Sequence, residues 1–233
     1  MSPASSQDPT ALRVYYGGTF DPIHHAHLAI ARAARDRLQC PVTLVPAADP
    51  PGRPPPRASA LQRLRMVELA VAAEAGIDVS DCELRRADRL HRPSYTIDTL
   101  AELRQRLGDT VPIAWLLGTD AFAHISHWHR WQDLLTVAHL VIADRPKEQA
   151  NPPAVPDVAQ SLVTTPSVTP SAALHASPSG QVMWLHQPTS PLSASHIRAA
   201  IAARAADWDA FVHPAVAHYI ATEQLYLCQT PPA

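Results

Sequence analysis

Residues 17–27, Gly-Gly-Thr-Phe-Asp-Pro-Ile-His-His-Ala-His, bring together residue types that can bind phosphate. They follow an apolar run over 12–16, which predicts a buried strand, and they lead into a helical pattern over 27–38. A strand that ends at two glycines and continues as a helix presents backbone N–H groups beside a helix N-terminus, where an anion is stabilised. Gly17 and Gly18 allow close approach of the backbone because they have no Cβ. The two glycines alone would also fit an ordinary turn, but the run as a whole favours a phosphate site.

Side chains of the same stretch add hydrogen-bond donors. Thr19 supplies a hydroxyl, and His24 and His27 are three residues apart, which puts both imidazoles on one face of a helix. Two imidazoles directed at a phosphate can neutralise charge that develops on it. A zinc site that includes His25 is the alternative. Three histidines at i, i+1 and i+3 cannot all face one ion, and no Cys or carboxylate nearby completes a tetrahedral set.

A second stretch, Leu-Ser-Ala-Ser-His-Ile-Arg at 192–198, also has the character of an anion site. Ser193 and Ser195 are residue types that cap helix N-termini, and Arg198 follows Ser195 by three residues. Hydroxyls and a guanidinium at the first turn of a helix favour phosphate. The alternative is a plain capped helix with a solvent-facing arginine.

Alternating strand and helix patterns must position these residues. They predict an α/β fold with a Rossmann-like, doubly wound parallel sheet and a small C-terminal helical part. Strands are expected at 12–16, 42–46, 79 with 82–84, 112–117, 140–143 and 182–185. Helices are expected at 27–38, 95–107, 128–135, 195–205 and 214–223, and a further one begins at Ser59. The motifs with chemical content lie where strands end, which is the usual binding edge of such a sheet.

Local signals fix several helix boundaries. Ser59 and Gln62 form a capping-box pattern, Gly108 is expected to end the preceding helix, and Pro214 suits a first turn. The apolar side of the helix after Ser59 is expected to comprise Leu61, Leu64, Val67 and Val71.

The 233 residues suit one domain, expected to span 11–228. Residues 1–10 are expected to be a disordered lead. Residues 146–181 are rich in Pro, Ser, Thr and Ala without periodicity, so a long surface insertion that is mostly loop is expected there. Such a segment could be a lid, but an insertion without a role in the reaction is favoured.

Composition limits the partners and the compartment. The formal net charge of −2 argues against a broad nucleic-acid interface, and no apolar run reaches the roughly 18 residues that a membrane span needs. Cys40, Cys82 and Cys228 are far apart in the sequence and suggest free thiols in a reducing cytoplasm. The pattern gives no indication of oligomeric state.

Both phosphate-binding stretches resemble elements of the nucleotidyltransferase superfamily. Residues 17–27 are similar to its T/S-x-x-H and H-x-G-H elements, although Ala26 stands where that pattern has Gly. Residues 192–198 are similar to its I/L-S-x-T/S-x-I-R element. The two elements occur in the expected order, which is more specific than either alone.

Three further stretches narrow the resemblance. They are Pro-Ser-Tyr-Thr-Ile-Asp-Thr-Leu at 93–100, Leu-Gly-Thr-Asp at 117–120 and Trp-His-Arg-Trp at 128–131. With them, the chain resembles bacterial nicotinate-nucleotide adenylyltransferase from about residue 14 to residue 226. One departure is His129, where that family often has an aromatic residue.

The resemblance implies transfer of the adenylyl group of ATP to nicotinate mononucleotide in NAD biosynthesis, with Mg²⁺ carried mainly by the ATP phosphates. It implies catalytic roles for His24, His27 and Arg198. It implies ATP contacts from Gly17, Gly18, Thr19, Phe20, Gly118, Asp120, Ser193, Ser195 and Ile197. It implies contacts to the mononucleotide from Thr96, Trp128, His129 and Arg145. By contrast, Trp131 is expected to be a core residue.

Two alternatives stay open at this point. Another superfamily member, a pantetheine-phosphate adenylyltransferase or a cytidylyltransferase, shares the first and last elements but lacks the stretch 93–96 together with Trp128. A non-catalytic nucleotide sensor on the same fold is the second alternative. The retained histidines and Arg198 count against the sensor, and turnover with ATP would distinguish the two.

Overall fold

The computed structural model describes residues 11–227 apart from 53, 91, 145–169 and 187–191. Its centre is a six-stranded sheet in the order β3-β2-β1-β4-β5-β6, in which every neighbouring pair is parallel. The strands are β1 (Arg13–Gly18), β2 (Val42–Pro46), β3 (Ile77–Val79), β4 (Ile113–Gly118), β5 (His139–Asp144) and β6 (Val182–His186). The parallel Rossmann-like sheet predicted from the sequence is confirmed.

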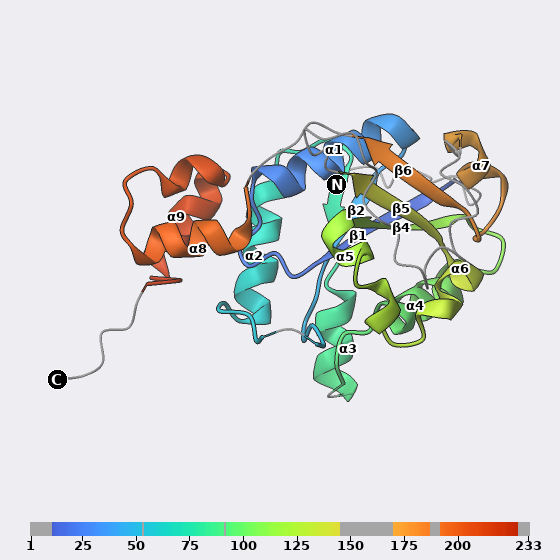
Figure 1. The fold of residues 1–233 in the computed structure, drawn as a ribbon, viewed down its shortest axis with the longest axis horizontal. Coiled ribbons are helices and arrows are strands. Elements are labelled where there is room, and N and C mark those ends of the chain that lie inside the picture. The colour runs from blue at the N-terminus through green and yellow to red at the C-terminus, as the bar shows by residue number, and fades with distance from the viewer. Residues whose placement is uncertain (1–10, 53, 91, 145–169, 187–191, 228–233) are drawn as a thin grey trace, which may run out of the picture.

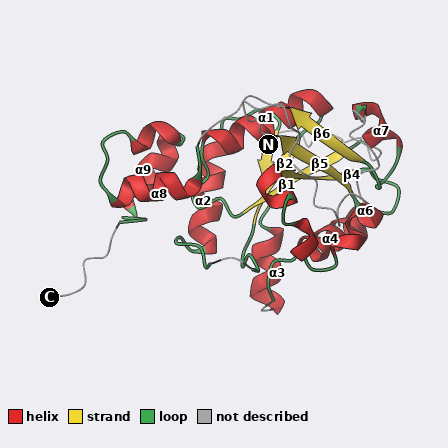
Figure 2. Ribbon diagram, viewed as in Figure 1, coloured by secondary structure: helices red, strands yellow, loops and turns green. Residues whose placement is uncertain are grey.

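Helices connect the strands and cover both faces of the sheet (Figures 1 and 2). The longer helices are α1 (His25–Leu38), α2 (Ala60–Val71), α3 (Cys82–Leu90), α4 (Thr96–Leu107), α8 (Ala194–Ala202) and α9 (Pro214–Thr222). The short helices are α5 (Thr119–Phe122), α6 (Leu134–Val137) and α7 (Ser171–Ala176). None of the helices that the structure describes is both long and apolar enough to cross a membrane.

Two hydrophobic cores lie on opposite faces of the sheet, because successive residues of a strand point to opposite sides. Tyr16 of β1 belongs to the core with α1 and α2, whereas the adjacent Tyr15 belongs to the core with α4 and α6. Helix α9 packs against α2, and both C-terminal helices (Figure 1) extend the first core with Ile197, Val216 and Ile220. The C-terminal helices are therefore part of the first core.

The expected strand at 82–84 is wrong. Residues Cys82–Leu90 form α3, and only Ile77–Val79 pairs with β2. The buried side of α3 carries Cys82, Glu83 and Arg86, so the buried positions are largely polar and the sequence has no apolar helical stripe there. Hydrogen bonds to neighbouring polar groups, described below, replace the usual apolar packing.

Two helix predictions also need correction. Helix α2 begins after Ser59 with the predicted capping box, but Leu61 is 73% exposed, because Arg63 occupies the buried side that Leu61 was expected to share. The expected helix over 128–135 is interrupted: Arg130 has a left-handed φ of 51°, a 3₁₀ turn covers Trp131–Asp133, and α6 follows.

The structure describes only residues 170–181 of the segment 146–181, which was expected to be a surface insertion that is mostly loop, so that prediction stays untested as a whole. Residues 171–176 form α7, where Leu174 is fully buried in the first core. The carbonyl of Pro178 accepts hydrogen bonds from Ile113 and from Arg104. This part is therefore integrated in the fold. Residues 1–10, 145–169 and Cys228 lie outside the described residues, so the expectations for them stay untested.

His139, the first residue of β5, makes the stability of the fold depend on pH. Its side chain is fully buried, the backbone N–H of Gln181 donates to Nδ1 at 3.0 Å, and Nε2–H donates to the carbonyl of Ser177 at 2.8 Å. Both ring nitrogens are therefore satisfied only in the neutral form. Burial accordingly lowers the pKa of His139 below its ordinary value of 6.5.

We expect His139 to reduce the free energy of unfolding in mildly acidic solution. Above pH 6.5 the residue is neutral in both states, and below pH 6.5 the unfolded chain takes up the proton first. Stability is lost on acidification by up to roughly 1.4 kcal/mol per pH unit. The measurement is urea unfolding of the wild type and His139→Gln between pH 7.5 and pH 5, since Gln can both donate and accept. Equal slopes against pH in the two proteins would contradict this assignment.

Candidate active site

The loop that follows β1 is shaped by aromatic side chains beneath it. A Cβ on Gly17 would lie 2.0 Å from Cζ2 of Trp115, and one on Gly18 would lie 2.7 Å from Cζ of Phe20. Neither position can carry a side chain without displacing a ring, because Trp115 and Phe20 fill the space that a Cβ would need. Phe20 itself has a φ of 50° and is buried, so its ring supports the loop from below.

His24 and His27 stand together at the start of α1. His24 is the N-cap residue, His27 lies in the first turn, and their rings stack with centroids 3.8 Å apart. The backbone N–H of His24 donates to Nδ1 of His27 at 3.3 Å, and the edge-to-face contact with Phe20 at 5.1 Å also holds the His27 ring. Because Nδ1 accepts, a neutral His27 carries its proton on Nε2 and can donate it to a ligand.

His25, between them, has different surroundings. It lies near Val212 and His213 of the C-terminal part, and burial together with the charges of Arg32 and His213 lowers its pKa. The structure thus brings together two of the three adjacent histidines, as the helical spacing predicted.

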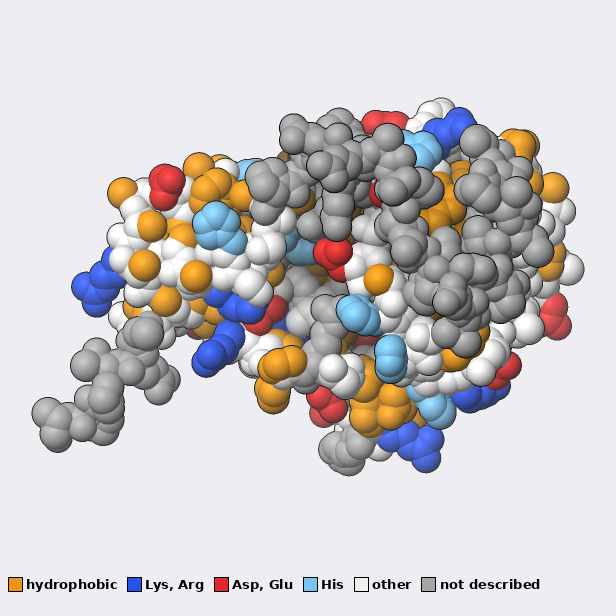
Figure 3. All heavy atoms as spheres, in the orientation of Figure 1, with side chains coloured by type: hydrophobic (Ala, Val, Ile, Leu, Met, Phe, Trp, Pro, Cys, Tyr) orange, Lys and Arg blue, Asp and Glu red, His pale blue; other side chains and the backbone are white. Residues whose placement is uncertain are grey.

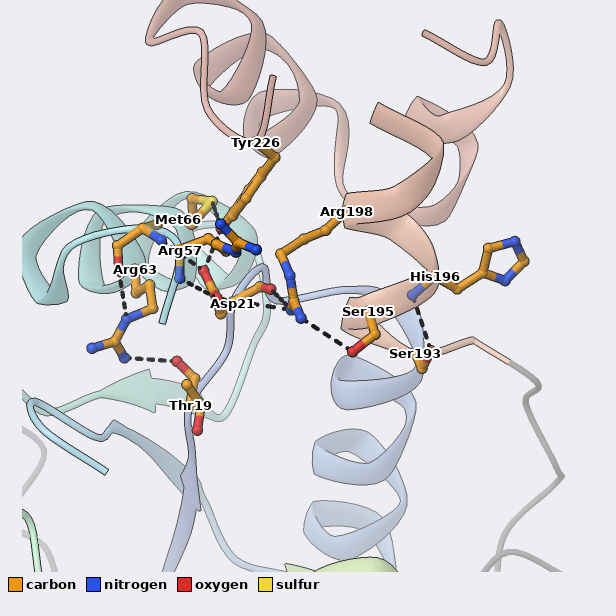
Figure 4. A network of polar contacts seen from close by, with 11 residues as sticks. Thr19, Asp21, Arg57, Arg63, Met66, Ser193, Ser195, His196, Arg198 and Tyr226 are labelled. Carbon is orange, nitrogen blue, oxygen red and sulfur yellow. Dashed lines mark hydrogen bonds and ion pairs between the residues drawn. The ribbon is translucent and has the colours of Figure 1, made fainter. Parts of the chain in front are cut away.

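Arg198 joins α8 to the loop after β1 (Figure 4). Its Nη1–H donates to the backbone carbonyl of Asp21 at 2.6 Å, and Nη2–H donates to Oγ of Ser195 at 3.1 Å. Ser193 caps α8, since its Oγ accepts the backbone N–H of His196 at 3.2 Å. Ile197 is fully buried and faces the core. Two sequence motifs 177 positions apart therefore meet at Asp21.

A second group of predicted residues meets near the start of α4. Thr96 is the first residue of α4, and the rings of Tyr95 and His129 lie 4.5 Å apart between centroids. Trp128 is half-buried and packs against the second core. Oγ of Ser94 accepts the backbone N–H groups of Ala48 and Asp49, which ties this segment to the loop after β2.

The remaining predicted residues lie at the end of β4 or outside the described part. Gly118 ends β4, and a Cβ there would meet nothing within 4 Å, so open space adjoins it. Asp120 is exposed in the first turn of α5. Arg145 is outside the described residues. Trp131, expected in the core, is partly buried against the second core.

Arg63 is a site residue that the sequence reasoning missed. Its side chain is almost fully buried, and it donates to the backbone carbonyls of Thr19, Ala47, Ala48 and Ala58 at 2.6 to 3.2 Å. One guanidinium therefore joins the loop after β1 to the loop after β2. Burial lowers the pKa of Arg63, and the nearby carboxylate of Asp21 counteracts that shift. A charged residue on the buried side of α2 was the only signal available.

A buried polar cluster under the 93–96 segment was also missed. Oγ1 of Thr99 donates to Glu83 at 2.6 Å and accepts from Nη2 of Arg86 at 2.6 Å. Burial raises the pKa of Glu83, while hydrogen bonds from Thr99 and Ser94 oppose the shift. The cluster fixes α3 against α4, directly behind the residues that precede Thr96.

Charge on the surface is mixed. On the face drawn in Figure 3, the described basic and acidic side chains are interspersed and form no extended basic area. Among the described residues, no group of three or more His, Cys, Asp or Glu side chains could hold a metal ion. The described site therefore offers backbone N–H groups, imidazoles and one guanidinium to an anion.

Comparison with known proteins assigns the class first. A sequence family described as cytidylyltransferase-like matches residues 15–200. A probable nicotinate-nucleotide adenylyltransferase of Xylella fastidiosa (strain 9a5c) is 50% identical over 216 residues, which cover 93% of this chain and 96% of the relative. One of Stenotrophomonas maltophilia (strain K279a) is 47% identical over 222 residues, which cover 95% and 99%. The chain belongs to the nicotinate-nucleotide adenylyltransferase family and is a nucleotidyltransferase enzyme.

Solved structures agree in fold. The nicotinic acid mononucleotide adenylyltransferase of Plasmodium falciparum, complexed with NaAD, superposes with a TM-score of 0.68 at 18% identity, covering 92% of this chain and 97% of the other. At that identity the likeness concerns the fold alone.

Proposed function

We propose that this chain transfers the adenylyl group of ATP to nicotinate mononucleotide, forming deamido-NAD and pyrophosphate in NAD biosynthesis. The names of its relatives support this reaction. The observation that carries it is the meeting of the His24–His27 pair and Arg198 at the loop after β1. The Thr96 and Trp128 segments add a second binding region. The substrates, ATP and a mononucleotide, and the free thiols of the buried Cys40 and Cys82 favour a cytoplasmic location.

The chemistry needs no protein nucleophile. The phosphate of the mononucleotide is already anionic and can attack the α-phosphorus of ATP directly, which displaces pyrophosphate. The enzyme then has to align the two phosphates and to stabilise the charge that grows on the leaving group. The backbone at the end of β1 would meet the first need, and donors fixed in place would meet the second.

We assign the triphosphate to the loop after β1 and to α8. The backbone of Gly17 and Gly18 and the hydroxyl of Thr19 would hold phosphate oxygens. His24 and His27 would neutralise charge on the α- and β-phosphates, with Nε2–H of His27 as a fixed donor. Ser193, Ser195 and Arg198 would bind from the start of α8. The list of ATP contacts is completed by Gly118 and Asp120 at the ribose and base, and by the backbone of the buried Phe20 and Ile197.

Mg²⁺ would enter this site only bound to the nucleotide. The described residues offer it no cluster of carboxylates, so we assign its ligands to phosphate oxygens and water, as is usual for this ion. Bound there, it would neutralise phosphate charge. The residues of the chain would orient the loaded nucleotide through the contacts given above.

We assign the pyridine ring to the region between α4 and Trp128. The first backbone N–H groups of a helix have no intrahelical acceptor, so those at Thr96, where α4 begins, would suit a carboxylate. Trp128 would stack on the ring, and the neighbouring His129, whose ring contacts Tyr95, would close the side of the pocket. Arg145 would lie near the mononucleotide.

We expect a strong preference for nicotinate over nicotinamide mononucleotide. The amide of nicotinamide is neutral and presents its own NH₂ donors to the donors at Thr96. Buried donors left unmatched cost about 1–3 kcal/mol each, so discrimination of roughly tenfold to several-hundredfold in kcat/KM follows. A coupled assay of ATP with each mononucleotide measures this ratio and tests the proposed reaction at the same time.

Trp128→Ala is the matched variant for this test. Stacking acts on both pyridine rings alike, so the variant should weaken both mononucleotides and leave their ratio nearly unchanged. Equal efficiency of the wild type with the two mononucleotides would contradict the carboxylate pocket. Absence of turnover with either would overturn the proposed reaction.

A further inference from the structure

The carboxylate of Asp21 is the centre of a network that the reaction as described does not use (Figure 4). Asp21 is buried, with 5% of its surface exposed. Its Oδ2 accepts the backbone N–H of Arg57 at 2.8 Å, and its Oδ1 accepts the backbone N–H of Ala58 at 3.1 Å. These contacts hold the loop before α2 against the loop after β1.

A third partner of the carboxylate comes from the C-terminal part of the chain. Tyr226 follows α9, has a left-handed φ of 65°, and donates its hydroxyl to Oδ1 of Asp21 at 2.8 Å, across 205 positions of sequence. The same hydroxyl lies 3.9 Å from Sδ of Met66 on α2. Burial and the adjacent Asp21 carboxylate raise the pKa of Tyr226, so the hydroxyl stays a donor.

The guanidinium of Arg198 lies near two acceptors of Asp21, its backbone carbonyl and its carboxylate. Its Nη1 donates to the backbone carbonyl of Asp21 at 2.6 Å but is 3.8 Å from the carboxylate Oδ2 of the same residue. A closer ion pair with that carboxylate would compete with a phosphate for the guanidinium. Donors that already satisfy the carboxylate reduce its attraction for Arg198.

We propose that Tyr226 is a positioning residue for Arg198. By satisfying Oδ1 of Asp21, its hydroxyl keeps the guanidinium on the backbone carbonyl and available to the triphosphate. This inference rests on the proposed function, because it takes ATP as the ligand of Arg198. Tyr226 thereby links the end of the C-terminal helical part to nucleotide binding without touching the nucleotide.

Tyr226→Phe tests the proposal, since it keeps the ring against Met66 and removes only the hydroxyl. Loss of one hydrogen bond to a charged group should raise KM for ATP roughly five- to tenfold. KM for nicotinate mononucleotide should stay within about twofold, because that site lies at α4. In an Arg198→Ala background, the same substitution should change KM for ATP less than about twofold, because the residue through which it acts is gone.

Tyr219→Phe is the matched control. Tyr219 is on α9 and lines the shallow groove between α2 and α9 with Arg65 and Leu69, so the same change there should leave both KM values unaltered. A merely structural role for Tyr226 would lower the active fraction without a selective rise in KM for ATP. Equal changes for both substrates, or additive effects with Arg198→Ala, would overturn the proposal.

Calorimetric titration with ATP alone separates this proposal from the proposed function. If the wild type formed no deamido-NAD, the proposed function would fail, but ATP binding by wild type and Tyr226→Phe would still be measured. A dissociation constant five- to tenfold higher in the variant supports the positioning role. Identical constants would overturn it, whatever the reaction.

Discussion

His27→Ala should lower the turnover number by roughly 10²–10³ while the fold stays intact, the range for losing one preorganised donor at a developing charge. Three contacts hold the ring before substrate binds: the backbone N–H of His24 on Nδ1, the stacked ring of His24, and the edge-to-face contact with Phe20. The donor Nε2–H is therefore fixed in direction, and alanine removes it completely. His24→Ala should act similarly, because the stacked partner is lost.

The measurement is kcat with saturating ATP and nicotinate mononucleotide. His25→Ala is the control, since His25 lies near Val212 and His213 and should matter much less. Circular dichroism and the thermal midpoint of each variant show whether the fold is retained. Turnover near that of the wild type in His27→Ala would rule out its assignment to the leaving phosphates.

Arg63→Met should lower the free energy of unfolding by several kcal/mol, because each buried acceptor left without its donor costs about 1–3 kcal/mol. Methionine fills most of the volume on α2 but leaves four backbone carbonyls without their donor. One of these carbonyls belongs to Thr19. The loop after β1 should therefore also become less rigid, and KM for ATP should rise.

Arg65→Met is the matched control on the same helix. Arg65 pairs with Glu68 at 3.1 Å with more than half of its side chain exposed, and such surface pairs contribute less than about 1 kcal/mol. Urea unfolding of both variants gives the comparison. If Arg63→Met and Arg65→Met were equally mild, the buried guanidinium would not be what joins the two loops.

Much of the fold could be predicted because the signals for it are local. Strand β1 ends at two glycines, β4 ends at Gly118, and Ser59 caps α2 with Gln62, all as expected. The two stretches at 17–27 and 192–198 could also be singled out, since their residue types are unusual in combination. Their contact at Asp21 became evident only from the folded structure.

The missed buried side chains share one physical cause. Glu83 and Arg63 are buried by hydrogen bonds to groups distant in sequence, so their helices lack the apolar periodicity on which prediction depends. Arg130 adopts a left-handed conformation that its residue type does not signal. The partnership of Tyr226 with Asp21 spans 205 positions and leaves no local pattern.

The contacts at Asp21 have a consequence for the order of events during translation. β1 and the loop after it are synthesised early, but Arg198 and Tyr226 emerge from the ribosome 177 and 205 positions after Asp21. Chains fold from the N-terminal side during synthesis, and distant contacts form late. A nascent chain can therefore form the loop after β1, the contact between His24 and His27 and the hydrogen bonds of Arg63 while Asp21 still lacks both C-terminal partners. Competence to bind nucleotide would then arrive as one of the last steps in the biogenesis of the enzyme.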